Sequence, residues 1–292
     1  MIKRVLKHTF ALLNIDYVKL NSQWNYKNVI SPYFRIYYID AGEGEIFNTT
    51  DRIILEPGFL YIIPSFTLCN LLCSNYLSQY FVQFFEESSD GISLFEHNRS
   101  MLKVKATDID ILNFKRLLEI NPGRGINGSD NPKVYEKNTF YKAYQELNNR
   151  QNMSTFTETH GILLQLVSRF LTQEIFRSET LQIPAKILNS ISYIQLNLQH
   201  ELTVNFLAQR ANLHTDYFSR LFFQHTGERP AKYIQEKRIE RAQYLMVTTQ
   251  MTFAEIANQT GFENVFYFSK IFKKVTGMSP GRYKKQIYTM DI

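Results

Sequence analysis

The feature that most constrains the fold is a segment near the C-terminal end that occurs twice. The sequence YFSRLFFQHTGERPAKY at Tyr217–Tyr233 returns as YFSKIFKKVTGMSPGRY at Tyr267–Tyr283, an offset of 50 residues. The similarity extends upstream, where Thr203–Ala211 aligns with Thr252–Thr260 at an offset of 49. Because the apolar residues in both copies follow helical spacing, the repeat predicts one unit built twice: a helix, a tight turn and a second helix.

Each copy carries the residue types that such a unit needs. Thr203 and Thr252 are suited to cap the first helix of each copy through their hydroxyls. Gly261 falls in the second turn, where a backbone with positive φ is expected. Apolar residues at i, i+3 and i+4 of each second helix predict its buried face: Phe218, Leu221 and Phe222 in the first copy, and Phe268, Ile271 and Phe272 in the second.

The opposite face of each second helix is polar. It carries Asp216, Ser219, Arg220 and Gln224 in the first copy, and Asn264, Ser269, Lys270 and Lys273 in the second. Helix-turn-helix units place such a face against base edges in the major groove of DNA, and successive grooves lie about 34 Å apart. A helix of about 15 residues, predicted at Ala231–Met246, spans about 22 Å and would join the two units.

The second copy is similar to the signature of the AraC/XylS family of transcription regulators. The segment E-I-A-N-Q-T-G-F followed by Y-F-S-K-I-F-K-K-V-T-G-M-S-P-G-R-Y carries the resemblance, which covers Ile187–Gln286. It implies an all-α domain of seven helices that reads an asymmetric site, with one recognition helix in each of two successive grooves. By position, the groove-facing residues would be Asp216, Ser219 and Arg220 in the first unit, and Asn264, Val265, Phe266, Ser269 and Lys270 in the second.

Three positions depart from the family pattern. Lys270 stands where the family usually has Arg, so it can donate to guanine but without the rigid guanidinium fork. Phe266 replaces a polar residue, which favours contact with thymine methyl groups or readout of DNA shape. His214 replaces a common Ser at the N-cap of the first recognition helix and is expected to cap it less well.

Some of these residues allow more than one interpretation. Arg220 and Lys270 are expected to contact bases or phosphates, with a plain surface position as the alternative. Lys273 and Lys274 are expected to contact phosphates. Asp216 would accept a hydrogen bond from a cytosine amine, repel phosphate, or help to cap its helix.

Two further groups are predicted to have internal or surface roles. Arg238 and Arg241 on the central helix are assigned to ion pairs or to the surface. The aromatic residues Tyr217, Phe218, Tyr267 and Phe268 are assigned to the core because their spacing is that of a buried helical face.

The charge distribution supports a nucleic-acid partner for the C-terminal part. Residues 185–292 contain 14 Lys and Arg against 8 Asp and Glu, whereas residues 1–184 contain 19 of each. The net charge of +6 therefore resides in the C-terminal part, as expected of a segment that meets a polyanion.

The first half of the chain has the pattern of short strands separated by Pro and Gly turns. Strands are predicted at Tyr33–Ile39, Ile53–Leu55, Phe59–Ile63 and Tyr80–Phe85, with a turn at Asp40–Gly44. Helical periods follow Asp108, with longer helices predicted at Tyr135–Arg150 and Phe156–Arg177 and a linker at Ser178–Pro184. In many family members the partner domain is a small cupin-like barrel followed by helices that dimerise.

The fold class expected is therefore α+β. A sensor and dimerisation domain would occupy residues 1–180, with a β-barrel at about 20–106 and helices at about 107–178. The DNA-binding domain would occupy residues 185–288, with helix-turn-helix motifs at about 203–226 and 252–276. The helix Phe156–Arg177 would either form the dimer face or cover the barrel.

A small molecule in the barrel mouth is the expected effector, and no residue is assigned to it. Trp24, Tyr26, Tyr37 and Tyr61 would either stack on a sugar ring or belong to the core or the rim of the barrel. The histidines lie outside the strands Tyr33–Pro64, so neither a metal site nor a cofactor is expected. The absence of an apolar run of about 18 residues and of a signal peptide predicts a cytoplasmic protein without membrane contact.

The function predicted is a sequence-specific, DNA-binding regulator of transcription, not an enzyme. It is expected to bind promoter DNA as a homodimer, to act on RNA polymerase as an activator or a repressor, and to respond to a small molecule. One alternative is a regulator that dimerises constitutively without a ligand. The others are an architectural DNA binder and a repair enzyme that uses Cys69 or Cys73 as an alkyl acceptor, which would need an activated thiolate.

Overall fold

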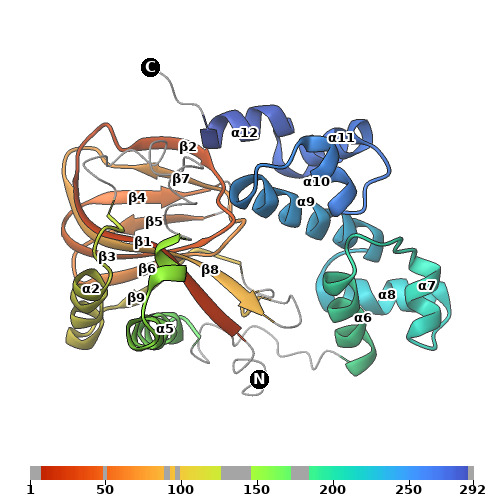
Figure 1. Cartoon of the computed structure of the whole chain (residues 1–292), viewed down its shortest axis with the longest axis horizontal. Coiled ribbons are helices and arrows are strands. Elements are labelled where there is room, and N and C mark those ends of the chain that lie inside the picture. Colours follow the sequence, from red (N-terminus) through yellow and green to blue (C-terminus); the bar gives the residue numbers. More distant parts are fainter. Residues whose placement is uncertain are drawn as a thin grey trace. The chain divides into compact units, whose positions relative to one another are not determined.

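The computed structural model describes residues 8–48, 51–88, 93–95, 99–125, 146–171 and 184–288. These form two compact units, which Figure 1 shows as a β-rich part and a helical part. The first unit contains strands β1–β9 with helices α2 and α5, and the second contains helices α6–α12. No helix among the described residues is both long enough and apolar enough to cross a membrane.

Two antiparallel sheets make up the first unit. The five-stranded sheet has the order β1-β8-β3-β6-β9 and the four-stranded sheet the order β2-β7-β4-β5. The strands are β1 (His8–Leu20), β2 (Asn25–Val29), β3 (Phe34–Gly42), β4 (Gly44–Phe47), β5 (Arg52–Leu55), β6 (Phe59–Ile63), β7 (Cys69–Leu72), β8 (Leu77–Ser88) and β9 (Leu102–Lys105). This confirms the α+β class, while closure of the sheets into a barrel stays a prediction.

The two sheets share one apolar core. Tyr37 on β3 lies opposite Tyr61 on β6 and Phe81 on β8, and their side chains pack with Ile46 and Leu71 of the other sheet. Trp24, Tyr26, Tyr37 and Tyr61 are all buried in this cluster. Of the roles considered for these four aromatics, the structure assigns them to the core.

The five-stranded sheet begins earlier than the predicted barrel limit of about residue 20. Strand β1 starts at His8, and its Phe10, Leu12, Leu13 and Ile15 are all buried. Because helices α2 and α5 contact this strand, both of its faces are covered and its sequence lacks the alternation of a half-exposed strand. The pattern that reveals other strands was therefore missing here.

The segment predicted as a turn at Asp40–Gly44 is instead the end of one strand and the start of another. β3 continues to Gly42, and Gly44 opens β4 in the other sheet. Of the two glycines, Gly42 has the positive φ, at +80°. The chain thus passes from one sheet to the other at Gly42, where the N–H of Glu43 donates to the carbonyl of Tyr76 at 2.9 Å.

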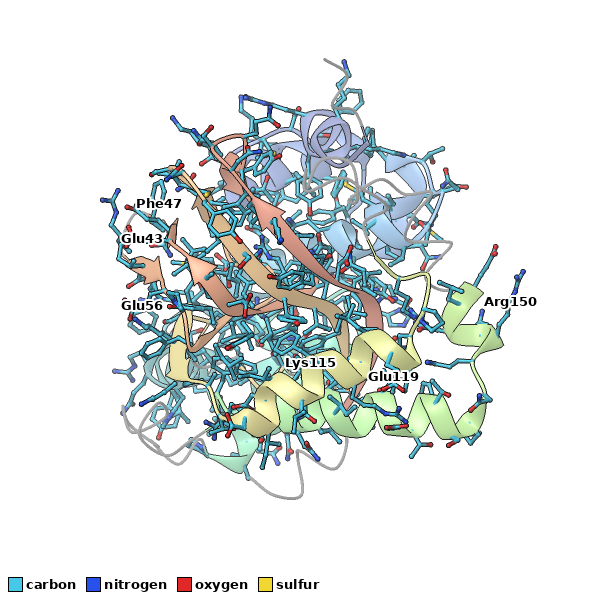
Figure 2. All side chains as sticks on the ribbon, turned by 90° about the vertical axis from the view of Figure 1, so that its left-hand side faces the viewer. Glu43, Phe47, Glu56, Lys115, Glu119 and Arg150 are labelled. Carbon is cyan, nitrogen blue, oxygen red and sulfur yellow. The ribbon has the colours of Figure 1, made fainter. Side chains whose placement is uncertain are left out.

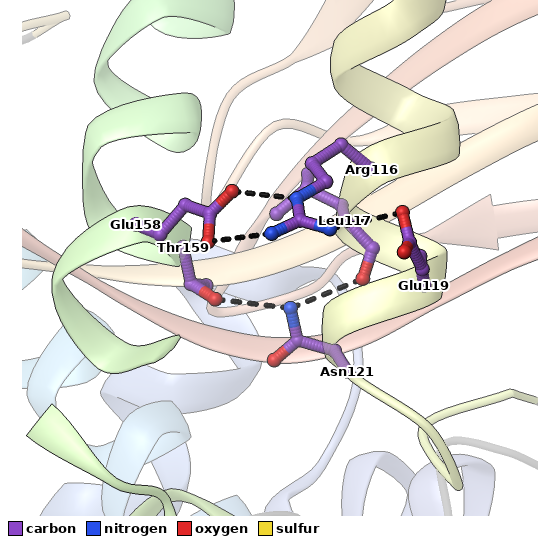
Figure 3. A network of polar contacts seen from close by, with 6 residues as sticks. All are labelled: Arg116, Leu117, Glu119, Asn121, Glu158 and Thr159. Carbon is purple, nitrogen blue, oxygen red and sulfur yellow. Dashed lines mark hydrogen bonds and ion pairs between the residues drawn. The ribbon is translucent and has the colours of Figure 1, made fainter. Parts of the chain in front are cut away.

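Helices α2 (Asp108–Ile120) and α5 (Met153–Ser168) pack together and against the five-stranded sheet. The Phe114 ring on α2 lies 6.0 Å from that of Tyr80 on β8. Figure 3 shows Arg116 of α2 reaching Glu158 of α5 with a two-pronged contact of 2.6 and 3.1 Å. Lys115 and Glu119 lie on the exposed side of α2 (Figure 2).

Helix α5 is shorter than the helix predicted at Phe156–Arg177, since it ends at Ser168. Arg169 follows it, and its guanidinium contacts Asp110 at 3.2 Å and the Lys105 carbonyl at 3.1 Å. The rest of that predicted helix from residue 172, most of the one at Tyr135–Arg150 and the linker up to residue 183 lie outside the described residues.

Between residues 184 and 288 the chain forms seven helices. They are α6 (Ala185–Leu196), α7 (Val204–Arg210), α8 (Thr215–Thr226), α9 (Pro230–Thr248), α10 (Phe253–Gln259), α11 (Val265–Thr276) and α12 (Pro280–Tyr288). Helices α7 and α8 form the first copy of the repeat, α10 and α11 the second, and α9 joins them.

Candidate nucleic-acid interface

The first helix-turn-helix unit is held by local caps. The Thr203 hydroxyl accepts the N–H of Phe206 at 3.1 Å and begins α7. In the turn, Asn212 has a φ of +52°, and the N–H of Leu213 donates to the Ala208 carbonyl at 3.0 Å. The imidazole of His214 caps α8 by accepting the N–H of Asp216, at a long 3.4 Å.

The second unit repeats this frame with stronger caps. Thr252 and Glu255 form a reciprocal capping box, in which the Glu255 carboxylate accepts the N–H of Thr252 at 2.7 Å. This hydrogen bond holds the pKa of Glu255 below its usual range. The side-chain oxygen of Asn264 accepts the N–H of Tyr267 at 2.8 Å and begins α11.

The apolar faces of the two recognition helices are buried. Phe218 and Phe222 of α8, and Phe268 and Phe272 of α11, are completely enclosed. The prediction was wrong for the preceding tyrosines, because Tyr217 is 49% exposed and Tyr267 is 43% exposed. A residue next to a buried phenylalanine is turned by about 100° around the helix, which carries it to the edge of the buried face.

The other face of each recognition helix is open to solvent. Exposed side chains at the predicted positions are Asp216, Arg220 and Gln224 in the first unit, and Asn264, Phe266, Lys270, Lys273 and Lys274 in the second. Ser219, Val265 and Ser269 are half-buried. The Ser269 hydroxyl donates to the Val265 carbonyl at 2.8 Å, and Phe266 is 84% exposed.

One exposed residue on this face was not among the predicted ones. Phe223 is 50% exposed and occupies in α8 the place that Lys273 has in α11, fifty residues later. The guanidinium carbon of Arg229 lies 5.9 Å from its ring centroid. The repeat offset gave the signal that could have found Phe223, but an apolar residue in a helix is read first as core.

The two exposed faces differ in charge. Helix α8 contains one Asp and one Arg, which cancel, whereas α11 contains three Lys and no acidic residue. The second recognition helix is therefore suited to a phosphate backbone, while the first presents a near-neutral polar surface.

A cluster of alternating charges lies at the start of α9, where Glu228 just before the helix and Glu236 within it flank Lys232. Lys232 contacts Glu228 at 2.7 Å and Glu236 at 3.3 Å. Burial and the neighbouring carboxylate of Glu228 raise the pKa of Glu236 from 4.5 to about 7. Between these two pH values the folded chain holds a proton that it releases on unfolding, so stability falls as the pH rises through this window.

We therefore expect the temperature at the midpoint of thermal unfolding to decrease as the pH is raised from 5 to 8. The substitution Glu236→Gln should make this decrease smaller, because the amide carries no charge to desolvate. Differential scanning calorimetry of the full chain measures it. Glu263→Gln, at an exposed carboxylate in the same unit, is the matched control and should leave the fall unchanged. An equal fall in wild type and Glu236→Gln would contradict this assignment.

Comparison with known proteins identifies similar helix-turn-helix regulators. A model for a helix-turn-helix domain matches residues 207–286. Over 100 residues the chain is 34% identical to the uncharacterized HTH-type transcriptional regulator YobQ of Bacillus subtilis, covering 34% of this chain and 42% of that protein. Over 110 residues it is 31% identical to the arabinose operon regulatory protein of Salmonella typhimurium, covering 37% and 39%. Each match thus spans less than half of the curated relative.

The similarity in fold extends over both units. The crystal structure of unsaturated fatty acid bound ToxT from Vibrio cholerae aligns with 96% of this chain and 94% of its own, with a TM-score of 0.53 at 14% sequence identity. At this identity the likeness concerns the fold alone. The two capped helix-turn-helix units, the domain match and the identities with these regulators show that the C-terminal part of the chain is a helix-turn-helix domain of the AraC/XylS type.

Proposed function

We propose that the chain is a sequence-specific regulator of transcription that binds promoter DNA through α8 and α11. The observation that carries the proposal is the pair of exposed recognition faces, which share one scaffold and differ in charge. A repeat that served only to bind any DNA would not need two different faces. The domain limits that go with this proposal are residues 1–180 for the sensor and 185–288 for the DNA-binding part.

The exposed side chains suggest a division of roles. Arg220 on α8 and Lys270 on α11 would donate to guanine, and Phe266 would contact thymine methyl groups. Lys273 and Lys274 in the last turn of α11 would bind phosphates. Asp216 would accept from a cytosine amine, since its carboxylate is exposed in the first turn of α8.

The half-buried and capping residues would have supporting roles. Ser219, Val265 and Ser269 would pack at the edge of the groove, and Gln224 would reach the backbone at the end of α8. The oxygen of Asn264 is engaged in its cap, so its amide nitrogen would be the group that meets DNA.

Selection of duplexes from a random library with the full chain, followed by gel-shift titration, tests the function. We expect the selected site to bind at least about 10³-fold more tightly than random duplex at physiological salt. Equal affinity for selected and random DNA would leave a nonspecific binder and overturn the proposal.

Arg220→Ala should lower the discrimination between the selected site and a site changed at its guanine by about 1–3 kcal/mol. Lys274→Ala is the contrasting variant, since loss of a phosphate contact should weaken binding to all sequences alike and reduce the salt slope by about 1. Gel shifts on both duplexes at several salt concentrations separate the two effects. If Arg220→Ala weakened both duplexes equally, Arg220 would be a phosphate contact.

For the unit that contains the two sheets, we propose that the sheets close into a cupin-like barrel and bind a small-molecule effector. We also propose that the protein forms a homodimer and acts on RNA polymerase in the cytoplasm. Support for an effector comes from the fold, because the ToxT structure that it resembles holds an unsaturated fatty acid. A thermal-shift screen of the full chain against fatty acids and sugars tests this. A constitutive dimer would show no shift with any compound and a dimer mass in sedimentation without ligand.

The repair-enzyme alternative finds no support in the two thiols. Cys69 and Cys73 are both buried and unbridged, and burial raises the pKa of the Cys73 thiol above its ordinary value. An alkyl acceptor needs an accessible thiolate.

A further inference from the structure

Arg238, near the middle of α9, links this helix to the first helix-turn-helix unit. Its Nε donates to the carbonyl of Leu198 at 3.0 Å, and a terminal guanidinium nitrogen donates to the carbonyl of His200 at 2.7 Å. Both carbonyls follow the end of α6, and Leu198 belongs to the core cluster of the first unit. A planar guanidinium is suited to hold two acceptors at a fixed angle, and lysine cannot reproduce this fork.

The same guanidinium borders the turn of the second unit. Gly261 has a φ of +74°, and a Cβ at this position would lie 2.3 Å from the Leu198 carbonyl oxygen and 2.8 Å from a terminal nitrogen of Arg238. The guanidinium carbon also lies 5.7 Å from the ring centroid of Phe262. The end of α6, the middle of α9 and the α10–α11 turn therefore meet at Arg238.

The turn of the first helix-turn-helix unit has no equivalent of the close approach seen at Gly261. Asn212 occupies the equivalent place, because the next residue in each copy, Leu213 or Phe262, donates its N–H to the equivalent alanine carbonyl. Asn212 has a positive φ like Gly261, but its side chain is exposed. Positive φ alone therefore does not require glycine here, and the close approach of the Leu198 carbonyl does.

We propose that Arg238 is a positioning residue that fixes the separation and relative angle of the two recognition helices, and so the spacing of the two half-sites that the chain accepts. The inference rests on the proposed function. Two linked binding modules gain affinity when their geometry matches both sites at once, and they lose this gain when the geometry is not held. Arg238 contacts both units without belonging to either recognition face.

The experiment uses the full chain and the duplex selected by the wild type. Four duplexes are compared: the selected site, the same site with its half-sites one base pair closer or further apart, and a version with one half-site scrambled. The variants are Arg238→Lys and Arg238→Ala, with Arg241→Ala as the matched control. Arg241 is an exposed arginine on the same helix whose guanidinium carbon lies 4.9 Å from the Tyr244 ring centroid.

Both Arg238 variants should bind the selected duplex about tenfold more weakly while the scrambled duplex changes less than about twofold. Their preference for the native spacing should also flatten, whereas Arg241→Ala should keep it. An equal loss on all four duplexes with an unchanged spacing preference would overturn the proposal. If circular dichroism shows that Arg238→Ala does not fold, the result for Arg238→Lys decides whether the proposal holds. If no site can be selected with the wild type, the proposed function is refuted instead.

Discussion

Phe272→Ala is expected to destabilise the second helix-turn-helix unit by about 3–5 kcal/mol, because it empties the centre of a closed aromatic cluster. The Phe272 ring lies 5.6 Å from that of Phe268 and 5.3 Å from that of Tyr283, measured between centroids, and all three side chains are buried. This loss is a large fraction of the roughly 5–15 kcal/mol by which a typical domain is stable. Hydrogen exchange of the full chain should show protection lost across α10–α12 and kept in the sheets.

Phe266→Ala is the matched control, since it removes the same side chain from the same helix. Phe266 is 84% exposed, so its removal should change stability by less than about 0.5 kcal/mol while weakening binding to the selected DNA. Similar losses of protection in both variants would show that Phe272 does not anchor this unit.

Gly42→Ala is expected to disrupt the passage between the two sheets. A Cβ at Gly42 would lie 2.2 Å from the carbonyl oxygen of Tyr76 and 2.9 Å from the Cα of Leu77, and both are backbone atoms that cannot rotate away. Gly42 also has a φ of +80°, which costs about 1–3 kcal/mol for other residues. With a further 1–3 kcal/mol for overpacking, the total should reach about 2–6 kcal/mol in chemical denaturation.

Gly58→Ala separates the two contributions. Gly58 has a similar φ of +85°, but nothing lies within 4 Å of its added Cβ. Its loss of stability should therefore reflect backbone strain alone and be smaller than that of Gly42→Ala. Equal losses would mean that the strand pair relaxes around the new methyl group.

The sequence predicted the helical unit more fully than the sheets, because the two copies of the repeat can be aligned with each other. Several positions that agree in both copies, such as Phe222 and Phe272, are fixed by packing, and both are fully buried. Positions that differ, such as Asp216 and Phe266, are exposed. The strands had no second copy, and β1 went unnoticed because burial on both faces removes its alternation.

The spacing of residues along the chain could not predict contacts between segments that are distant in sequence. Tyr217 and Tyr267 share the helical period of the core and still lie at its edge, where the Tyr267 hydroxyl accepts from Gln235 at 3.1 Å. Arg238 and Arg241 are alike in sequence, yet one holds two carbonyls and the other is exposed. Which residue of such a pair turns inward depends on the segment packed against it.

The difference between Asn212 and Gly261 makes the two copies of the repeat non-interchangeable. A chain in which the second copy was replaced by the sequence of the first would bring an asparagine side chain onto the Leu198 carbonyl, where even one carbon atom does not fit. A second copy moved into the first position would meet no such obstacle at its glycine, since Asn212 faces solvent. Recombination between the copies, in nature or by design, would therefore be tolerated in one direction at this turn and opposed in the other.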